Sequence, residues 1–275
     1  MASGVGRWLL VVALGSTWLS AAARAEPRQL PAAESAPRWL MMVATRCTDP
    51  QREADFNSWY DDIDIPDVLE VPGYQRARRG KIVDAVVPGL SPLPQIGRYV
   101  ALYDIDSDAI DKTIIEMLMA TRKMESRNRS TDLLKVTERV YYHEYRSAIA
   151  AANPPAPAGQ EYLFVERVDC CADAAERRRF NSWYDGTHVP QMLRRSGMQR
   201  ATRYELYRVL MIEDQLASRY LTVYEFSAPS PAAAQLEADL AREQLRAGAP
   251  VDEWTTRRSI LYQKLRDVRR ATGGR

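Results

Sequence analysis

One histidine of the sequence lies in a motif whose residue types are suited to proton transfer. The run FNSWYD at 180–185 is followed by His188 and Pro190. An imidazole titrates near neutrality, so His188 is the predicted catalytic acid or base. Asn181, Asp185 and His188 are spaced i, i+4 and i+7, so on a continuous helix they share one stripe and Asp185 can orient the ring. The alternative is that His188 only hydrogen-bonds the loop before Pro190.

The same motif occurs a second time, 124 residues earlier. FNSWYD recurs without change at 56–61, but Asp64 stands where the later copy has His188, and Asp61 matches Asp185. An ordinary aspartate has a pKa of about 4 and stays ionised at neutral pH. We therefore expect two unlike sites, with function mainly in the second copy and an equivalent site at Asp64 and Asp61 in the first.

Aromatic and basic residues near the second motif are candidates for substrate contact. The residues predicted to bind substrate are Asn181, Trp183, Tyr184, Arg200, Tyr204 and Tyr224. The motif aromatics recur at i, i+3 and i+4, which equally suits core packing. Arg200 and Tyr204 alternate along one strand, so their shared face is either interior or solvated. His143, in a different strand, is predicted to be structural.

Each copy contains the same order of elements to position these residues. Apolar runs at 39–45 and 162–168 predict buried strands, and each is followed by a helix that carries the motif. Two further strands, a second helix beginning near Ser107 or Ser230, and a last strand complete each copy. Strand, helix, strand, strand, helix, strand is the ferredoxin-like split βαβ arrangement. Helices cover one face of such a sheet, so we expect the two sheets to pack or close face to face.

The flanking segments predict export and a two-domain organisation. Arg7, an apolar run and small residues ending at Ala25 are typical of a cleaved signal peptide, placing the protein in the periplasm or outside the cell. The expected segments are a signal peptide at 1–25, a linker at 26–37, a first domain at 38–147, an Ala/Pro-rich linker at 148–160, a second domain at 161–268 and a tail at 269–275.

Composition limits the partners. Without the signal, 36 Lys and Arg balance 36 Asp and Glu, so no long-range field favours nucleic acid or anionic lipid. We expect a small-molecule ligand and no membrane contact after cleavage, and self-association stays open. The three cysteines, Cys47, Cys170 and Cys171, have no metal-binding spacing, so no metal is predicted, and their pairing stays open.

The motif carries a family resemblance. F-N-x-W-Y-x-x-H-x-P, followed by a leucine, a glycine and an Arg-rich strand, resembles the EthD-like proteins of the dimeric α/β-barrel superfamily, and the resemblance covers nearly the whole mature chain twice. It implies an α+β fold of two ferredoxin-like split βαβ domains that form an intramolecular dimeric α/β barrel. Asp64 departs from the pattern, which puts the first site in doubt.

The resemblance also indicates the class of activity. It implies acid/base chemistry without a cofactor, of lyase, isomerase or monooxygenase type, on a small hydrophobic or aromatic molecule. Two alternatives stay open, because a fold does not determine a function. One is a ligand-binding protein without chemistry, and the other is a haem-binding barrel with His188 as axial ligand.

Overall fold

The computed structural model describes residues 28–29, 39–83, 97–152, 159–213, 217–250 and 254–271. The predicted signal peptide at 1–25 and most of the linker at 26–37 lie outside these residues. The first half comprises β2 (Trp39–Cys47), α1 (Glu53–Trp59), α2 (Ile65–Glu70), β3 (Tyr74–Ile82), β4 (Tyr99–Ile105), α3 (Ile110–Ser126) and β5 (Leu134–Ala150). The second comprises β6 (Gln160–Cys170), α4 (Ala174–Trp183), α5 (Val189–Leu193), β7 (Met198–Ile212), β8 (Tyr220–Ala228), α6 (Pro231–Gly248) and β9 (Trp254–Arg269). The predicted split βαβ order is confirmed in both halves.

The two sheets join into one closed barrel, as the predicted fold class requires. The strand order is β5-β2-β4-β3-β9-β6-β8-β7, and β5 also pairs with β7. Antiparallel pairing of β3 with β9 and of β5 with β7 forms the two seams between the halves. At the first seam Gly80 lies against Tyr262, where an added Cβ would be 2.8 Å from the tyrosine Cβ. A short strand, β1 (Arg28–Gln29), pairs with β5 outside the closed ring.

The segment predicted as a linker is shorter than expected. β5 runs to Ala150 and β6 begins at Gln160, both inside 148–160, and residues 153–158 lie outside the described part of the chain. The last strands of the two halves also extend well beyond their apolar runs. They lengthen because β5 and β9 each pair with a strand of the other half, which a single repeat cannot indicate.

Side chains fill the barrel interior. Alternate strand residues point inward and form one apolar cluster that includes Leu40, Met42, Val100, Leu102, Leu163 and Val165. The interior also contains buried ion pairs. Arg78 donates hydrogen bonds to Asp104 and Glu225, and Arg167 donates to Glu138. Burial alone would raise the pKa of Glu225, but the charges of Arg78 and Arg76 lower it to about 2. The interior is therefore a packed core.

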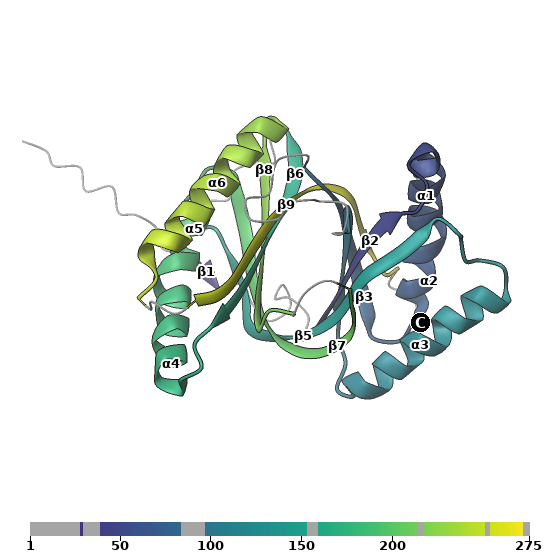
Figure 1. Cartoon of the computed structure of the whole chain (residues 1–275), viewed down its shortest axis with the longest axis horizontal. Coiled ribbons are helices and arrows are strands. Elements are labelled where there is room, and N and C mark those ends of the chain that lie inside the picture. The colour runs from purple at the N-terminus through teal and green to yellow at the C-terminus, as the bar shows by residue number, and fades with distance from the viewer. Residues whose placement is uncertain are drawn as a thin grey trace, which may run out of the picture.

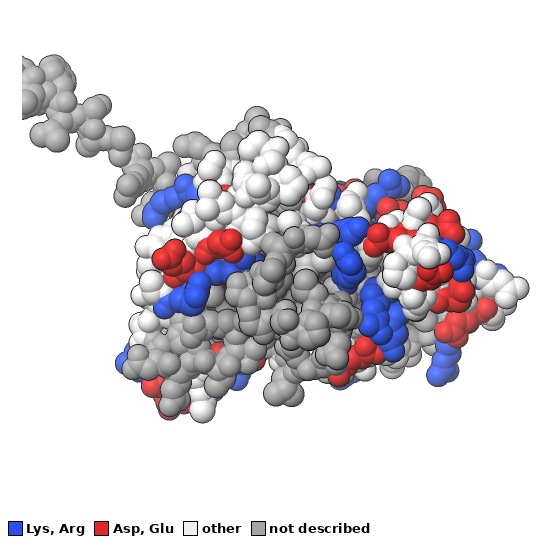
Figure 2. Space-filling view, turned by 45° about the horizontal axis from the view of Figure 1, so that its top comes forward, with Lys and Arg blue, Asp and Glu red and all other residues white. Residues whose placement is uncertain are grey.

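The helices cover the outer face of the barrel on two opposite sides. Figure 1 shows α1, α2 and α3 on one side and α4, α5 and α6 on the other. Phe56 and Phe180 are completely buried between helix and sheet, in two separate clusters, so these motif aromatics belong to the core. Among the described residues, no helix is both long and apolar enough to cross a membrane. On the face shown in Figure 2, basic and acidic residues lie side by side.

Candidate functional site

His188 lies in a completely buried polar cluster beneath α4 and α5. Its Nε2 is 3.1 Å from Oε2 of Glu166, and its ring stacks on Trp183 at 5.4 Å between centroids. The Tyr184 hydroxyl donates to the same Glu166 oxygen and lies 3.4 Å from the hydroxyl of Tyr224. The structure thus brings His188 together with three predicted substrate contacts, Trp183, Tyr184 and Tyr224. Glu166, which sequence reasoning missed, is the carboxylate that orients the imidazole.

The predicted pairing of Asp185 with His188 is wrong. Asp185 instead accepts hydrogen bonds from Arg203 at 2.9 Å and Arg146 at 3.1 Å. The helix does continue past Gly186, but residues Tyr184–His188 form a π-helical turn. A π turn contains more residues per turn than an α-helix, so i+3 and i+4 neighbours no longer share one stripe. This rotation separates Asp185 from the imidazole.

In both halves, the Asn, Tyr and Asp shared by the two motifs contact one arginine side chain, an arrangement that we call the arginine clamp. Arg203 donates to Asp185 and to Asn181, at 2.6 Å for the latter, and its guanidinium lies 4.3 Å from the centre of the Tyr184 ring. The side-chain oxygen of Asn181 therefore accepts a hydrogen bond from Arg203, whereas the sequence predicted that Asn181 binds substrate.

The clamp of the first half is built from the equivalent residues. Arg79 donates to Asp61 at 3.0 Å and to Asn57 at 2.7 Å, and lies 4.3 Å from the centre of the Tyr60 ring. The signal that could have revealed it is the spacing, because Arg79 and Arg203 are also 124 residues apart. The repetition of FNSWYD is thus explained by folding alone.

Arg200 and Tyr204 do not join His188. Tyr204 is completely buried in the barrel interior, on the face of the sheet opposite α4 and α5. Arg200 belongs to the same interior charge network, where it helps to lower the pKa of Glu225 after the larger effects of Arg78 and Arg76. Arg200 and Tyr204 do share one face of their strand, as predicted. That face points into the barrel, whereas residues of opposite parity, such as Arg203, face the helices.

A cavity of about 220 Å³ lies at the equivalent position in the first half. It lies between the sheet and the helices α2 and α3, and it reaches the Asp64 carboxyl. Its walls are mixed: the apolar part includes Met41, Val43, Val68, Met117, Leu134 and Val136, and the polar part includes Glu125 and Arg139. His188 does not line this cavity.

The side chains at equivalent positions differ between the cavity of the first half and the filled cluster of the second. In the sheet register Val43 lies opposite Ala101 and Arg139, whereas Glu166 lies opposite Thr222 and Ser259. The second half thus carries Glu166, Thr222 and the His188 imidazole where the first carries Val43, Ala101 and Asp64. On the covering helices, the buried residues of α6 are mainly alanines, whereas those of α3 include Met117 and Met124. A small-residue face permits closer helix packing on the sheet.

Asp64 is an acid poised to titrate near neutral pH. Burial raises its pKa to about 6, although a hydrogen bond from Tyr103 and the charges of Arg139 and Arg79 oppose the rise. The Tyr103 hydroxyl donates to Oδ2 at 3.1 Å. A perturbed carboxyl in a cavity is a recognised mark of functional sites. The sequence predicts an ordinary aspartate pKa of about 4 unless the carboxyl is deeply buried, and burial moves the pKa to about 6 in the folded chain.

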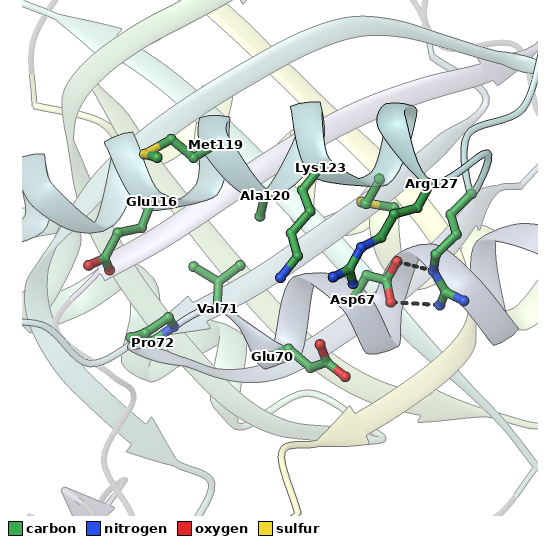
Figure 3. A pocket seen from close by; sticks show the side chains of 11 residues that line it. Asp67, Glu70, Val71, Pro72, Glu116, Met119, Ala120, Lys123 and Arg127 are labelled. Carbon is green, nitrogen blue, oxygen red and sulfur yellow. Dashed lines mark hydrogen bonds and ion pairs between the residues drawn. The ribbon is translucent and has the colours of Figure 1, made fainter.

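An open groove lies outside this cavity. It has a volume of about 610 Å³ between α2 and α3, and Met124 lines both the groove and the cavity. Figure 3 shows Lys123 and Arg127 projecting from α3 toward the α2 side of the groove. Asp67 accepts two hydrogen bonds of 2.7 Å from Arg129 at one end. Met124 therefore lies at the boundary between solvent and the Asp64 cavity.

The cysteine pairing, left open by the sequence, is local. Cys170 and Cys171 form a disulfide between adjacent residues at the end of β6, and Cys47 is free. The bonded pair lines a separate pocket with Asp169 and Arg219.

Comparisons with known proteins support the fold. No protein-family model matches the sequence, and no curated protein matches it. The chain is similar in structure to an anthrone oxidase-like protein (TM-score 0.51, 11% identity, 85% of this chain and 94% of that one). It is also similar to a candidate monooxygenase from Fusobacterium nucleatum (TM-score 0.50, 9% identity, 86% and 96%). The shared architecture is the dimeric α/β barrel.

The expectation that no cofactor is involved is overturned. Structures with this fold include a heme complex of a DypB variant from Rhodococcus jostii (TM-score 0.47, 12% identity, 83% and 93%). The residues of this chain fit haem poorly, however. His188 is enclosed with Nε2 on Glu166, and His143 is exposed with its ring 4.5 Å from that of Trp39. Neither histidine therefore presents a free ring nitrogen to an open cavity that the described residues form at the Asp64 site or in the groove outside it.

Proposed function

We propose that this chain is a small-molecule enzyme in which Asp64 gives or takes a proton inside the first-half cavity. The observation that carries the proposal is a carboxyl with a pKa of about 6 at the wall of an apolar cavity. A general acid or base works best when its pKa lies near the working pH. The proposed substrate is a small molecule with a hydrophobic part, because methionine, valine and leucine side chains form the apolar part of a cavity of about 220 Å³.

The neighbours of Asp64 support proton transfer. Tyr103 donates to Oδ2, which holds the carboxyl in place and leaves Oδ1 for the proton that moves. Arg139 lines the same cavity, and its guanidinium can stabilise negative charge that develops on a substrate oxygen. Isomerase, lyase and monooxygenase outcomes all include such a proton transfer. The proposal thus moves the reaction from His188, the predicted centre, to the equivalent position in the first half.

Hydrogen–deuterium exchange into substrate tests the proposal. The protein is incubated in D₂O with small molecules that co-purify with it, and mass spectrometry follows both product formation and deuterium incorporation. Asp64→Asn should lose both by about a hundredfold or more, which is the typical contribution of a positioned acid or base. Asp62→Asn, an exposed carboxylate on the same helical turn, should retain both. Full exchange in folded Asp64→Asn, or loss in His188→Gln alone, would place the chemistry in the second half.

A ligand-binding protein without chemistry is the second candidate. It is favoured by the arginine clamps, because they explain the repeated motif without any catalytic demand. In that case a molecule would bind in the cavity, and no deuterium would enter it.

Membership among the EthD-like proteins, origin by tandem duplication and export belong to the same proposal. The repeat of FNSWYD and of the clamp arginines at one spacing supports duplication. The apolar run before Ala25 supports cleavage of a signal peptide. Amino-terminal sequencing of protein from a periplasmic fraction tests the export.

A further inference from the structure

The helices α3 and α6, which hold equivalent positions in the two halves, carry exposed apolar side chains at matching places. Their N-caps are 121 residues apart. At the same spacing Ile115 matches Leu236, and these side chains are 58% and 59% exposed. One turn later Met119 matches Leu240, at 64% and 38% exposure. Residues i and i+4 share one face of a helix, so these pairs form two apolar stripes in solvent, which we call the α3 stripe and the α6 stripe.

The α6 stripe rises from a closed surface. Gln244 of α6 donates a hydrogen bond to Gln191 of α5 at 2.6 Å. Arg195, which follows α5, donates to Glu237 of α6 at 2.9 Å. These two contacts join α6 to its neighbouring helix. The two exposed leucines of the α6 stripe therefore form a ridge on that surface.

The α3 stripe borders a hollow instead. Asp67 stands at the repeat position of Gln191, but its carboxylate accepts from Arg129, beyond the end of α3. Val71 stands at the position of Arg195 and has no charge to pair with α3. The open groove of about 610 Å³ lies between α2 and α3, and the methionine of the α3 stripe lines it (Figure 3). The ridge on α6 and the hollow beside α3 are thus complementary in shape.

Charged residues next to the two stripes have opposite signs at matching positions. Arg122 lies one turn after the α3 stripe, and Glu243 holds the same place beside the α6 stripe. One turn further, Glu125 of α3 matches Arg246 of α6. All four side chains are exposed. When the two helices lie parallel with their stripes in contact, Arg122 meets Glu243 and Glu125 meets Arg246. Two copies of α3 in that arrangement would instead oppose like charges, and so would two copies of α6.

We propose that the chain self-associates by packing α6 of one copy, side by side and parallel, on α3 of a second copy. The leucine ridge covers the α3 stripe and the rim of the groove, and the two pairs of opposite charges flank it. Figure 1 shows α3 and α6 on opposite sides of the barrel, so two copies cannot form both contacts with each other. The contact therefore repeats from copy to copy and builds a closed ring or an open filament. The proposed chemistry of Asp64 plays no part in it.

Sedimentation velocity of the chain between about 1 and 100 µM tests this contact. Wild type should form species larger than a dimer as its concentration rises. Met119→Glu on α3 and Leu240→Glu on α6 should each be monomeric, because each places a charge in an apolar contact. An equimolar mixture of the two variants should form a dimer and nothing larger, since one chain keeps only α6 and the other keeps only α3. Leu265→Glu, at an exposed leucine of β9, should assemble like wild type and is the matched control.

Exchange of the flanking charges tests the parallel orientation independently. Arg122→Glu and Glu243→Arg should each weaken assembly about fivefold, and both changes in one chain should restore it, because the ion pair is rebuilt with its signs reversed. Circular dichroism shows that each variant is folded. A wild type that stays monomeric at about 100 µM, a mixture of the two stripe variants that stays monomeric, or a double charge variant without recovery would overturn the proposal. Dimers of Leu240→Glu alone would also overturn it, because they would show α3 pairing with α3.

Discussion

Replacing Asp64 by asparagine should stabilise the protein at neutral pH and leave its stability unchanged in acid. Burial raises the pKa of Asp64 from 3.8 to about 6, so the folded state binds this proton more tightly than the unfolded state. Between these two values the folded chain holds more protons, and the free energy of unfolding falls as pH rises. Well above pH 6, the ionised carboxyl lowers the free energy of unfolding by the full amount that the pKa shift implies. Asparagine has nearly the same shape and carries no charge at any pH.

The magnitude follows from the size of the pKa shift. About 1.4 kcal/mol per pKa unit gives on the order of 3 kcal/mol at pH 7. The carboxyl keeps some solvent contact at the cavity wall, so water screens part of this cost. We therefore expect Asp64→Asn to gain about 1 to 3 kcal/mol at pH 7 and close to nothing at pH 4. A group that destabilises the fold in its working state is typical of functional sites.

Urea unfolding at several pH values between 4 and 8 measures the effect. Wild type and variant are compared at each pH, so contributions from all other groups cancel. Asp62→Asn is the matched control, because Asp62 is exposed on the same helical turn and should show no such slope. A gain that is equal at pH 4 and pH 7, or a loss at pH 7, would refute the reasoning about Asp64.

Three further predictions concern the clamp, the seam and the cavity entrance. Arg79→Met leaves Asp61 without its buried partner and should cost about 3 kcal/mol in urea unfolding; a cost below about 1 kcal/mol would show that the clamp is dispensable. Gly80→Ala places a methyl group against Tyr262 and should lower stability by about 1 to 3 kcal/mol, measured as a lower melting temperature, and an unchanged temperature contradicts the tight seam. Met124→Trp should fill the entrance and slow deuterium incorporation into the co-purifying molecules at least tenfold without unfolding the protein, as judged by circular dichroism; unchanged incorporation would mean that these molecules enter elsewhere.

Much of the architecture follows from local patterns in the sequence. Apolar runs predict the strands of both copies of the split βαβ unit, and the helix expected to begin near Ser230 begins at Pro231 with Ser230 as its cap. One apolar sheet face per copy predicts that the sheets close on each other. The extent of β5 and β9 could not be read locally, because these strands lengthen by pairing across the seams.

The candidate site was predicted less completely. The motif drew attention to His188 and Asp64, yet the partners that decide their chemistry lie on strands distant in sequence. Glu166 reaches His188 from β6, and Tyr103 reaches Asp64 from β4. Asp185 was assigned by helical spacing, and a π-helical turn that the spacing does not reveal moved it to Arg203.

The sequence by itself determined the repeat, the fold class and the unlike residues at the two equivalent positions. These depend on residue identity and short-range periodicity, which are visible along the chain. Only the tertiary structure decided that the second position is filled and the first borders a cavity, because partners such as Glu166 reach His188 from strands distant in sequence. It also decided that Asp64 titrates near neutrality, since desolvation depends on everything packed around the carboxyl.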